Sequence, residues 1–245
     1  MFLEFRKNNY SQNGEDGVLE KITNLLELNN LELCEFGAWD GVQGSNTFNL
    51  LKKYNAKCVY IEGDKKKYAS LLKTTEKNPN ITPINTYIDV SQNKLDNILS
   101  KTFLKKNFDI LSIDIDSNDL DVWESLENYQ PKIVVIEINS SIKPGILQKH
   151  SLEHQGNSFS STISVGKKKM YTAVCHTGNL IFVKNEYIDK LNFPKDLIND
   201  PKKLFINDWV NEKNNFLIKL IRWFLPEKLL HLIPSKIKVF IKKLL

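Results

Sequence analysis

The sequence predicts an α/β domain built on a mostly parallel sheet. Seven apolar segments recur along the chain, and helix-forming stretches separate most of them. Such alternation implies right-handed βαβ crossovers, which join neighbouring parallel strands. Residues 110–113 and 133–136 are apolar without strict alternation, as is typical of central strands covered on both faces. The predicted strands are Leu31–Phe36, Lys57–Glu62, Ile81–Val90, Phe108–Asp114, Lys132–Ile138, Met170–His176 and Asn179–Val183.

The end of this series and the helix starts refine the fold class. Only Thr177-Gly178 separates the last two strands, which favours an antiparallel hairpin. Helices are expected to start near Ser45, at Asp64 and at Ser117 or Asn118, because each can cap a helix shortly after a strand. The loops before these helices should lie at the carboxyl edge of the sheet, where open α/β folds bind ligands. Five parallel strands and a terminal hairpin form the Rossmann-like, seven-stranded pattern of class I methyltransferases.

Length and cysteine content bound the organisation of the chain. Its 245 residues, of which 41% are hydrophobic, suit one large domain with an appendage. We expect the domain in residues 1–205 and a basic tail in residues 206–245. The three cysteines, Cys34, Cys58 and Cys175, fall inside predicted strands, where a cysteine is usually a small buried apolar residue. An odd count without a signal peptide indicates a reducing compartment, so we expect a cytoplasmic protein.

The formal net charge of +5 is concentrated near the carboxyl terminus. Residues 213–245 contain eight basic residues and one acidic residue, a net charge of +7, which leaves −2 for the remainder. A DNA- or RNA-binding domain would carry its positive face on the folded core. We therefore expect no nucleic-acid partner.

The tail has two amphipathic segments, residues 216–225 and 236–245, separated by a proline-containing stretch. Neither reaches the roughly 18 apolar residues that a transmembrane helix needs. Basic amphipathic helices suit the surface of an anionic membrane, which predicts peripheral contact at its inner face. A helical hairpin packed on the domain or on a second subunit is an equal alternative. The sequence leaves the oligomeric state open.

The segments Leu33–Gly41 and Val59–Asp64 form the most informative pattern. An apolar strand, a glycine-containing turn, a helix and a second strand ending in an acid make a nucleotide-binding half-fold. The acid, Glu62, is placed to accept hydrogen bonds from both ribose hydroxyls. The turn lacks the three-glycine dinucleotide fingerprint, so the pattern favours S-adenosylmethionine, which has a ribose and an amino-acid end but no phosphate. A nicotinamide-dependent oxidoreductase is disfavoured for the same reason.

Further acids follow the other strands. Asp40 follows the first strand and Asp114 the fourth. Asp89 is expected to end the third strand and to accept a hydrogen bond from an adenine amino group, with Ile88 and Val90 packing on the ring. Helix capping or simple solvation is the alternative for Glu62, and a role without ligand contact is equally open for Asp89. The residues predicted to contact the cofactor are Glu35, Gly37, Ala38, Asp40, Glu62, Gly63, Asp89 and Asp114.

A second acidic group joins two neighbouring strands. Asp114, Asp116 and Asp119 follow one strand, and Glu137 and Asn139 end the next. Several carboxylates in one cleft repel each other, so either one is protonated or a cation neutralises them. All-oxygen ligands suit Mg²⁺, and Asp116, Glu137 and Asn139 are its expected ligands. Substrate binding and helix capping are the alternatives.

His150 and His154 lie in a predicted loop after the fifth strand. Histidine can accept the proton of a hydroxyl near neutral pH, so these two residues and Asp116 are the candidate proton acceptors. Solvent exposure without a catalytic role is the alternative for both histidines.

The motifs taken together resemble the FkbM-type S-adenosylmethionine-dependent methyltransferases, in order from about residue 10 to residue 184. The resemblance implies O-methylation of sugars, surface glycans or other hydroxylated molecules, and cofactor contacts by Glu35, Gly37 and Glu62. Where relatives often have Asp-Ile-Asp-Gly, this chain has Ser117. A non-catalytic nucleoside-binding protein that docks to a membrane complex is the alternative function. The motifs are residues 11–17 (SQNGEDG), 35–41 (EFGAWDG), 45–47 (SNT), 61–64 (IEGD), 111–116 (LSIDID), 136–139 (IEIN) and 179–183 (NLIFV).

Overall fold

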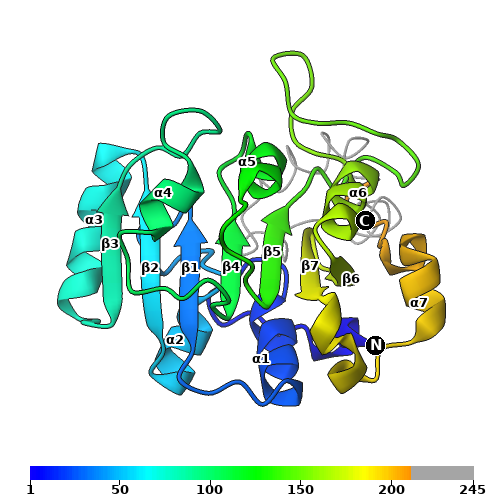
Figure 1. Ribbon diagram of the computed structural model, residues 1–245, viewed down its shortest axis with the longest axis horizontal. Helices are drawn as coiled ribbons and strands as arrows, with labels where there is room; N and C mark the ends of the chain where they lie inside the picture. Colours follow the sequence, from blue (N-terminus) through cyan, green and yellow to red (C-terminus); the bar gives the residue numbers. More distant parts are fainter. Residues whose placement is uncertain (211–245) are drawn as a thin grey trace, which may run out of the picture.

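Seven strands form one sheet in the computed structural model, which describes residues 1–210 (Figure 1). Their order across the sheet is β3-β2-β1-β4-β5-β7-β6. The strands are β1 (Glu32–Phe36), β2 (Lys57–Glu62), β3 (Ile81–Asn85), β4 (Ile110–Ile113), β5 (Ile133–Glu137), β6 (Tyr171–His176) and β7 (Asn179–Lys184).

Strands β1 to β5 pair in parallel, and β7 runs antiparallel to both β5 and β6. The predicted hairpin is therefore present, and β7 is inserted between β5 and β6. Because the chain builds outward from β1 through β2 to β3 and then returns to β4, the connections diverge between β1 and β4. Open α/β sheets bind ligands at such a switch point. The predicted class I methyltransferase fold is confirmed.

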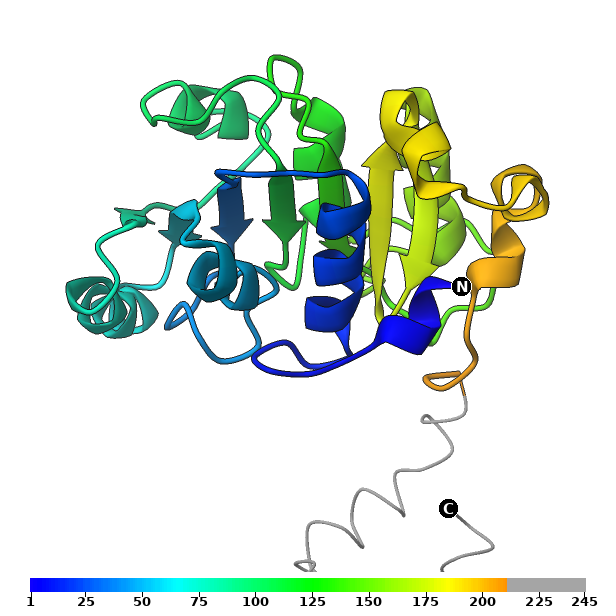
Figure 2. The same ribbon diagram turned by 90° about the horizontal axis from the view of Figure 1, so that it is seen from below.

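Helices cover both faces of the sheet. α1, α2 and α3 lie along one face, and α4, α5 and α6 lie along the other (Figure 2). This two-sided cover explains why the residues of β4 and most of those of β5 are buried. The helices are α1 (Glu15–Leu25), α2 (Phe48–Tyr54), α3 (Lys65–Glu76), α4 (Leu95–Leu99), α5 (Asp119–Ser125), α6 (Phe159–Lys168) and α7 (Lys195–Asn199).

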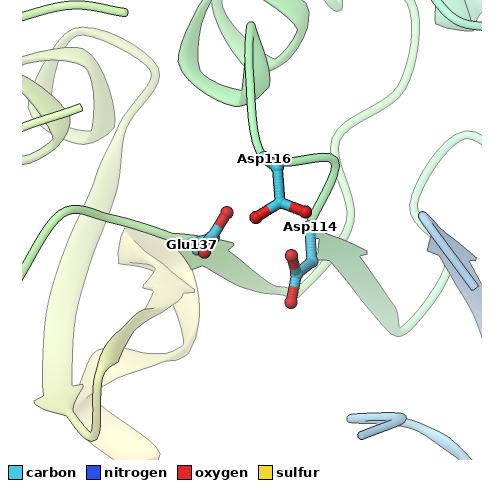
Figure 3. A group of neighbouring side chains, drawn as sticks. All are labelled: Asp114, Asp116 and Glu137. Carbon is cyan, nitrogen blue, oxygen red and sulfur yellow. The ribbon is translucent and has the colours of Figure 1, made fainter. Parts of the chain in front are cut away.

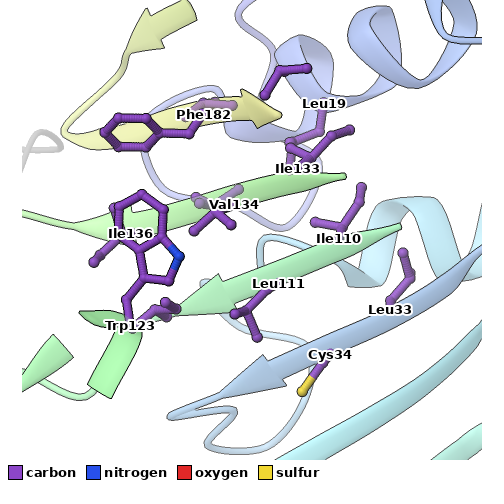
Figure 4. Close-up of a cluster of buried hydrophobic side chains, with 14 of the residues drawn as sticks. Leu19, Leu33, Cys34, Ile110, Leu111, Trp123, Ile133, Val134, Ile136 and Phe182 are labelled. Atoms are coloured by element: carbon purple, nitrogen blue, oxygen red, sulfur yellow. The ribbon is translucent and has the colours of Figure 1, made fainter. Parts of the chain in front are cut away.

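The hydrophobic core lies between the sheet and these helices (Figure 4). Trp123 of α5 is fully buried, and its ring centroid lies 4.9 Å from that of Phe182 on β7. Truncation of such an aromatic residue to alanine typically costs about 3–5 kcal/mol, so this contact anchors α5 and the loop before it. The three cysteines are free and buried, as predicted.

Two predicted element boundaries are wrong. Strand β3 ends at Asn85, whereas the prediction extended it to Val90. The Asp89 carboxylate closes a turn by accepting hydrogen bonds from the backbone N–H groups of Ser91 and Gln92, so this segment cannot continue the ladder. Helix α2 begins at Phe48 instead of near Ser45, although the Ser45 hydroxyl does accept a hydrogen bond from the Phe48 N–H group.

The first residues of the predicted tail pack on the domain. The backbone N–H of Ile206 donates to His176 Nδ1, and the Trp209 ring centroid lies 5.5 Å from that of His176. The amphipathic segments predicted in residues 216–225 and 236–245 lie outside the described residues. Within residues 1–210, no helix is long and apolar enough to cross a membrane.

Candidate active site

Two cavities open at the carboxyl edge of the sheet. The first, which we call the β1–β2 cavity, has a volume of about 580 Å³ and is bounded by the loops after β1, β2 and β3. The second, the β5–β7 cavity, has a volume of about 570 Å³ and is bounded by the loops after β5 and before β7. Five residues line both cavities: Gln12, Gly44, Asp114, Asp116 and Glu137.

The turn after β1 is held tightly against the neighbouring strands. Gly37 has φ = +78°, and a Cβ atom there would lie 1.6 Å from the Asp114 carbonyl oxygen, so only glycine fits. The N–H groups of Gly37 and Ala38 both donate to the Ile61 carbonyl. These two amides are therefore occupied and do not form a free cradle for a phosphate.

Glu62 fixes the same turn. Its Oε2 accepts a hydrogen bond from the Trp39 N–H at 2.8 Å, and its Oε1 accepts one from the Asp64 N–H at 2.8 Å. Only 6% of the residue is exposed, and it lines the β1–β2 cavity. Each carboxylate oxygen has a further lone pair, so Glu62 can hold the turn and still accept from a ligand.

Glu35 has a structural role that the prediction of cofactor contact did not include. Its carboxylate accepts hydrogen bonds from the Ser45 hydroxyl and from the backbone N–H groups of Asn46 and Thr47. Burial raises the pKa of this carboxyl group, and the hydrogen bonds oppose that shift. Although Glu35 lines the β1–β2 cavity, most of its bonding capacity holds the loop before α2.

Sequence reasoning missed two aromatic residues of this cavity. Trp39 is 46% exposed and Tyr87 is 69% exposed, and both line the β1–β2 cavity. The Tyr87 ring lies against the Gly63 backbone, where a Cβ atom would approach it to 2.4 Å. A flat apolar wall of this kind suits a purine ring. Their only sequence signal is an aromatic residue next to a turn.

The remaining predicted cofactor residues divide into two groups. Asp40 and Asp89 do not line the β1–β2 cavity. The other predicted cofactor residues do line it: Glu35, Gly37, Ala38, Glu62, Gly63 and Asp114. The Asp40 carboxylate accepts hydrogen bonds from the N–H groups of Val42 and Gln43 in its own loop. In both residues, the carboxylate accepts hydrogen bonds from its own loop.

Asp114, Asp116 and Glu137 face one another where the two cavities meet (Figure 3). One oxygen from each carboxyl group lies within 4.8 Å of the others. Burial and the neighbouring acids raise the pKa values of Asp114 and Glu137. Because each carboxyl group disfavours the ionised form of the other, the pair favours binding a proton. Protonation is thus one sufficient way to relieve the repulsion among these acids.

The structure revises the predicted metal ligands. Asn139 does not join Asp116 and Glu137, because its Nδ2 donates to the Gln155 carbonyl and its Oδ1 accepts from Ser141. Asp114 takes its place in the cluster. Three convergent carboxyl groups match the oxygen ligands of a hard divalent cation, but a cation would compete with the proton that the raised pKa values of Asp114 and Glu137 favour.

The loop after β4 adapts to serine at position 117. Asp116, rather than residue 117, takes the left-handed conformation, with φ = +57°. Asp119 secures this turn, since its two carboxylate oxygens accept from the N–H groups of Ile115 and Ser117. The glycine that relatives often carry at position 117 is therefore not required here.

Neither predicted histidine lines the β1–β2 cavity or the β5–β7 cavity. His150 Nδ1 accepts a hydrogen bond from the Gly156 N–H, and His154 is exposed in a turn closed by Ser151. The neighbouring residues Gln155 and Gly156 do line the β5–β7 cavity. Of the three predicted proton acceptors, the structure brings only Asp116 to the junction of the cavities.

A third histidine, absent from the prediction, supports the cavity wall. His176 is fully buried, and burial lowers its pKa to about 4. Its Nδ1 accepts from the Ile206 N–H, so the proton is on Nε2, which donates to the Ser140 hydroxyl at 2.8 Å. Ser140 in turn donates to the Gly178 carbonyl and lines the β5–β7 cavity.

Several solved structures are similar to this chain at TM-scores below 0.5. The N-terminal domain of EvdMO1, solved in the presence of S-adenosyl-homocysteine (SAH) and D-fucose, is 10% identical, with coverage of 74% of this chain and 91% of that chain and a TM-score of 0.44. M. capricolum TrmK in complex with SAH is 15% identical, with coverage of 84% and 88% and a TM-score of 0.46. The citrinin polyketide synthase CMeT domain is 14% identical, with coverage of 69% and 51% and a TM-score of 0.48.

No curated protein matches the chain in sequence. One family model does match, from within α2 to the first residue of α6, and the match includes Asp114, Asp116 and Glu137. Residues 51–159 match the model described as the methyltransferase FkbM domain, which confirms the resemblance predicted from the sequence.

Proposed function

We propose that this protein transfers the methyl group of S-adenosylmethionine to a hydroxyl oxygen of a sugar, surface glycan or similar molecule. The observation that carries this proposal is the meeting of two cavities of similar volume at three carboxyl groups. One cavity suits a nucleoside and the other suits a polar acceptor. Methyl transfer needs this arrangement, since donor and acceptor must meet in line.

The β1–β2 cavity supports S-adenosylmethionine as the donor. Glu62 can accept hydrogen bonds from ribose hydroxyls, and Trp39 and Tyr87 provide apolar faces for the base. The N–H groups of Gly37 and Ala38 are already bonded to Ile61, so this turn lacks the free amides that a pyrophosphate would require. A nucleoside without phosphates fits this cavity better than a dinucleotide.

The β5–β7 cavity supports a hydroxylated acceptor. Its described wall combines side-chain amides, hydroxyl groups and carboxyl groups, which donate to and accept from sugar hydroxyls. The indole of Trp209 lines the same cavity and offers an apolar face to a sugar ring. Among the lining residues are Asn46, Asn139, Ser140, Ser141, Asn157 and Asn179.

The junction residues supply the remaining chemistry. When bound, S-adenosylmethionine supplies an electrophilic methyl group on a positively charged sulfur. Asp116 is positioned to accept the hydroxyl proton as the new carbon–oxygen bond forms. The raised pKa values of Asp114 and Glu137 favour protonation of one of these two carboxyl groups, which keeps the negative charge at the junction below three.

Calorimetric titration of the protein with SAH tests the donor site. Glu62→Ala should weaken binding by about 1–3 kcal/mol, the value for hydrogen bonds to a charged group. Glu76→Ala is the matched control, because Glu76 is an exposed residue at the end of α3 outside both cavities. Unchanged affinity in Glu62→Ala would remove Glu62 from the site. Tight binding of NAD without binding of S-adenosylmethionine would contradict the proposed donor.

A further inference from the structure

Gln12 is the one uncharged side chain among the five residues that line both cavities, since Gly44 has none. It belongs to the motif of residues 11–17, which no predicted function used. Gln12 and Gly44 come from the loops before α1 and α2, whereas the acids come from the loop after β4 and from the end of β5. The junction therefore has an amide as well as its carboxyl groups.

Two buried carboxylates fix the backbone on both sides of Gln12. Asp16 Oδ2 accepts hydrogen bonds from three consecutive N–H groups, those of Asn9, Tyr10 and Ser11, at 2.7–2.9 Å. Glu15 Oε2 accepts from the Asn13 N–H at 2.9 Å. Both acids are fully buried. Burying two carboxylates is costly, so this segment is held in place by strong, specific bonds.

The same segment is tied to the wall of the β5–β7 cavity. Glu15 Oε1 accepts a hydrogen bond from the Thr177 hydroxyl at 2.7 Å, and the Gly44 N–H donates to the Tyr10 carbonyl at 2.9 Å. Gly44 has φ = +72°, and a Cβ atom there would lie 2.7 Å from Gln12 Nε2. The absence of a side chain at Gly44 leaves the space in which the Gln12 amide lies.

The Gln12 side-chain amide forms no hydrogen bond within residues 1–210, and the residue is exposed at the cavity surface. Its backbone is fixed, while the donors and the acceptor of its side chain form no hydrogen bond to the described residues. The Asn139 amide in the wall of the β5–β7 cavity, by contrast, is bonded to its own loop. An unbonded amide on a fixed backbone segment at the meeting point of two cavities is suited to binding a ligand.

We propose that Gln12 binds at the point of methyl transfer, where its amide donates to the acceptor hydroxyl oxygen beside the sulfonium group of the donor. The inference rests on the proposed function. One lone pair of the hydroxyl oxygen accepts from Gln12, another attacks the methyl carbon, and the proton passes to Asp116. The carbon–sulfur bond breaks, and the sulfur keeps its electron pair as a neutral thioether. A neutral amide orients the hydroxyl without competing for its proton.

The placement can be measured without knowing the acceptor. S-adenosylmethionine carries a positive sulfur and SAH does not, so a new negative charge beside that sulfur should favour the first ligand selectively. In the full-length protein at pH 8.5, Gln12→Glu should raise the affinity ratio of S-adenosylmethionine to SAH by about tenfold, a modest Coulomb effect for a solvent-exposed site. Gln130→Glu is the matched control, because Gln130 is exposed and lines neither cavity. Equal ratios in the two variants would overturn the placement.

The role can be measured with Gln12→Ala and a panel of neutral methyl glycosides. The variant should bind SAH within about twofold of the wild type and form SAH from saturating S-adenosylmethionine at least tenfold more slowly, since orientation of the acceptor is lost. Gln130→Ala should retain the wild-type rate, because Gln130 lines neither cavity. An unchanged rate in Gln12→Ala, or an equal loss of SAH affinity, would overturn the role. If the wild type binds SAH but methylates no glycoside, the proposed sugar acceptor fails, and the charge test still decides the position of Gln12.

Discussion

Gly37→Ala separates the two reasons why the turn after β1 requires glycine. At φ = +78°, an alanine pays a conformational cost of about 1–2 kcal/mol for the left-handed region. Its Cβ would also lie 1.6 Å from the Asp114 carbonyl oxygen, so β1 and β4 would have to move apart at their carboxyl ends. Such overpacking typically costs about 1–3 kcal/mol. The expected total is a loss of about 2–5 kcal/mol in the free energy of unfolding.

Gly145→Ala provides the control for the conformational term. Gly145 has φ = +99°, and no atom lies within 4 Å of the position its Cβ would take, so only about 1–2 kcal/mol should be lost. Urea unfolding of the full-length protein measures both variants, and the midpoints are comparable if the slopes agree. Equal destabilisation by the two substitutions would refute the inference that Gly37 is needed for the close approach of β4.

Three further predictions concern pH, metal and the tail. Because burial lowers the pKa of His176 to about 4, the unfolded chain binds more protons than the folded protein between about pH 6.5 and 4, and stability should fall as the pH falls through this window. The difference in free energy of unfolding between wild type and His176→Gln, measured with urea, should shrink by about 2 kcal/mol from pH 7 to pH 5. A constant difference would contradict the assignment. If Mg²⁺ binds Asp114, Asp116 and Glu137, excess chelator should lower the rate of methyl transfer and added Mg²⁺ should restore it. Full activity in excess chelator would assign these acids to proton transfer or substrate binding. We also propose that the basic tail attaches to anionic membranes. A chain ending at Asn211 should stay folded but no longer sediment with anionic vesicles, and vesicle binding by the full-length chain should weaken with salt. If truncation unfolds the domain or splits a dimer, the tail is instead a packing element.

The parts of the fold that local sequence determines were predictable. The strand cores, the hairpin at Gly178 and the helix cap at Asp64 depend on apolar periodicity or on one capping residue, and the structure confirms them. The extension of β3 failed because residues 86–90 alternate like a strand, while the Asp89 turn that ends it depends on one side chain.

The site was less predictable, because its contacts join distant parts of the chain. Glu15 is bonded to Thr177, 162 positions away, and His176 is bonded to Ser140 and Ile206. No periodicity or spacing reveals such pairs. The histidine prediction relied on residue type, which does not tell whether a loop folds toward a cavity. The acidic cluster was more predictable, since parallel neighbouring strands bring their carboxyl ends together.

The polar residues at the carboxyl edge divide by what their side chains bind. Glu15, Asp16, Glu35 and Asp119 are buried and accept hydrogen bonds from backbone N–H groups, so their negative charge fixes loop geometry. Burial raises the pKa values of Glu15, Glu35 and Asp119, which shows that the fold keeps these acids at an energetic cost.

Gln12 and Asp116 lie among these fixed loops with their side chains free of hydrogen bonds to other described residues. Because buried acids fix the loops around them, the two residues can meet a ligand without reorganising the backbone, and preorganisation of this kind lowers the barrier to a transfer step. Glu35→Gln should therefore lower both stability and activity, whereas Asp116→Asn should lower activity alone. Activity and urea-unfolding measurements on both variants test this division, and a loss of stability in Asp116→Asn comparable to that in Glu35→Gln would contradict it.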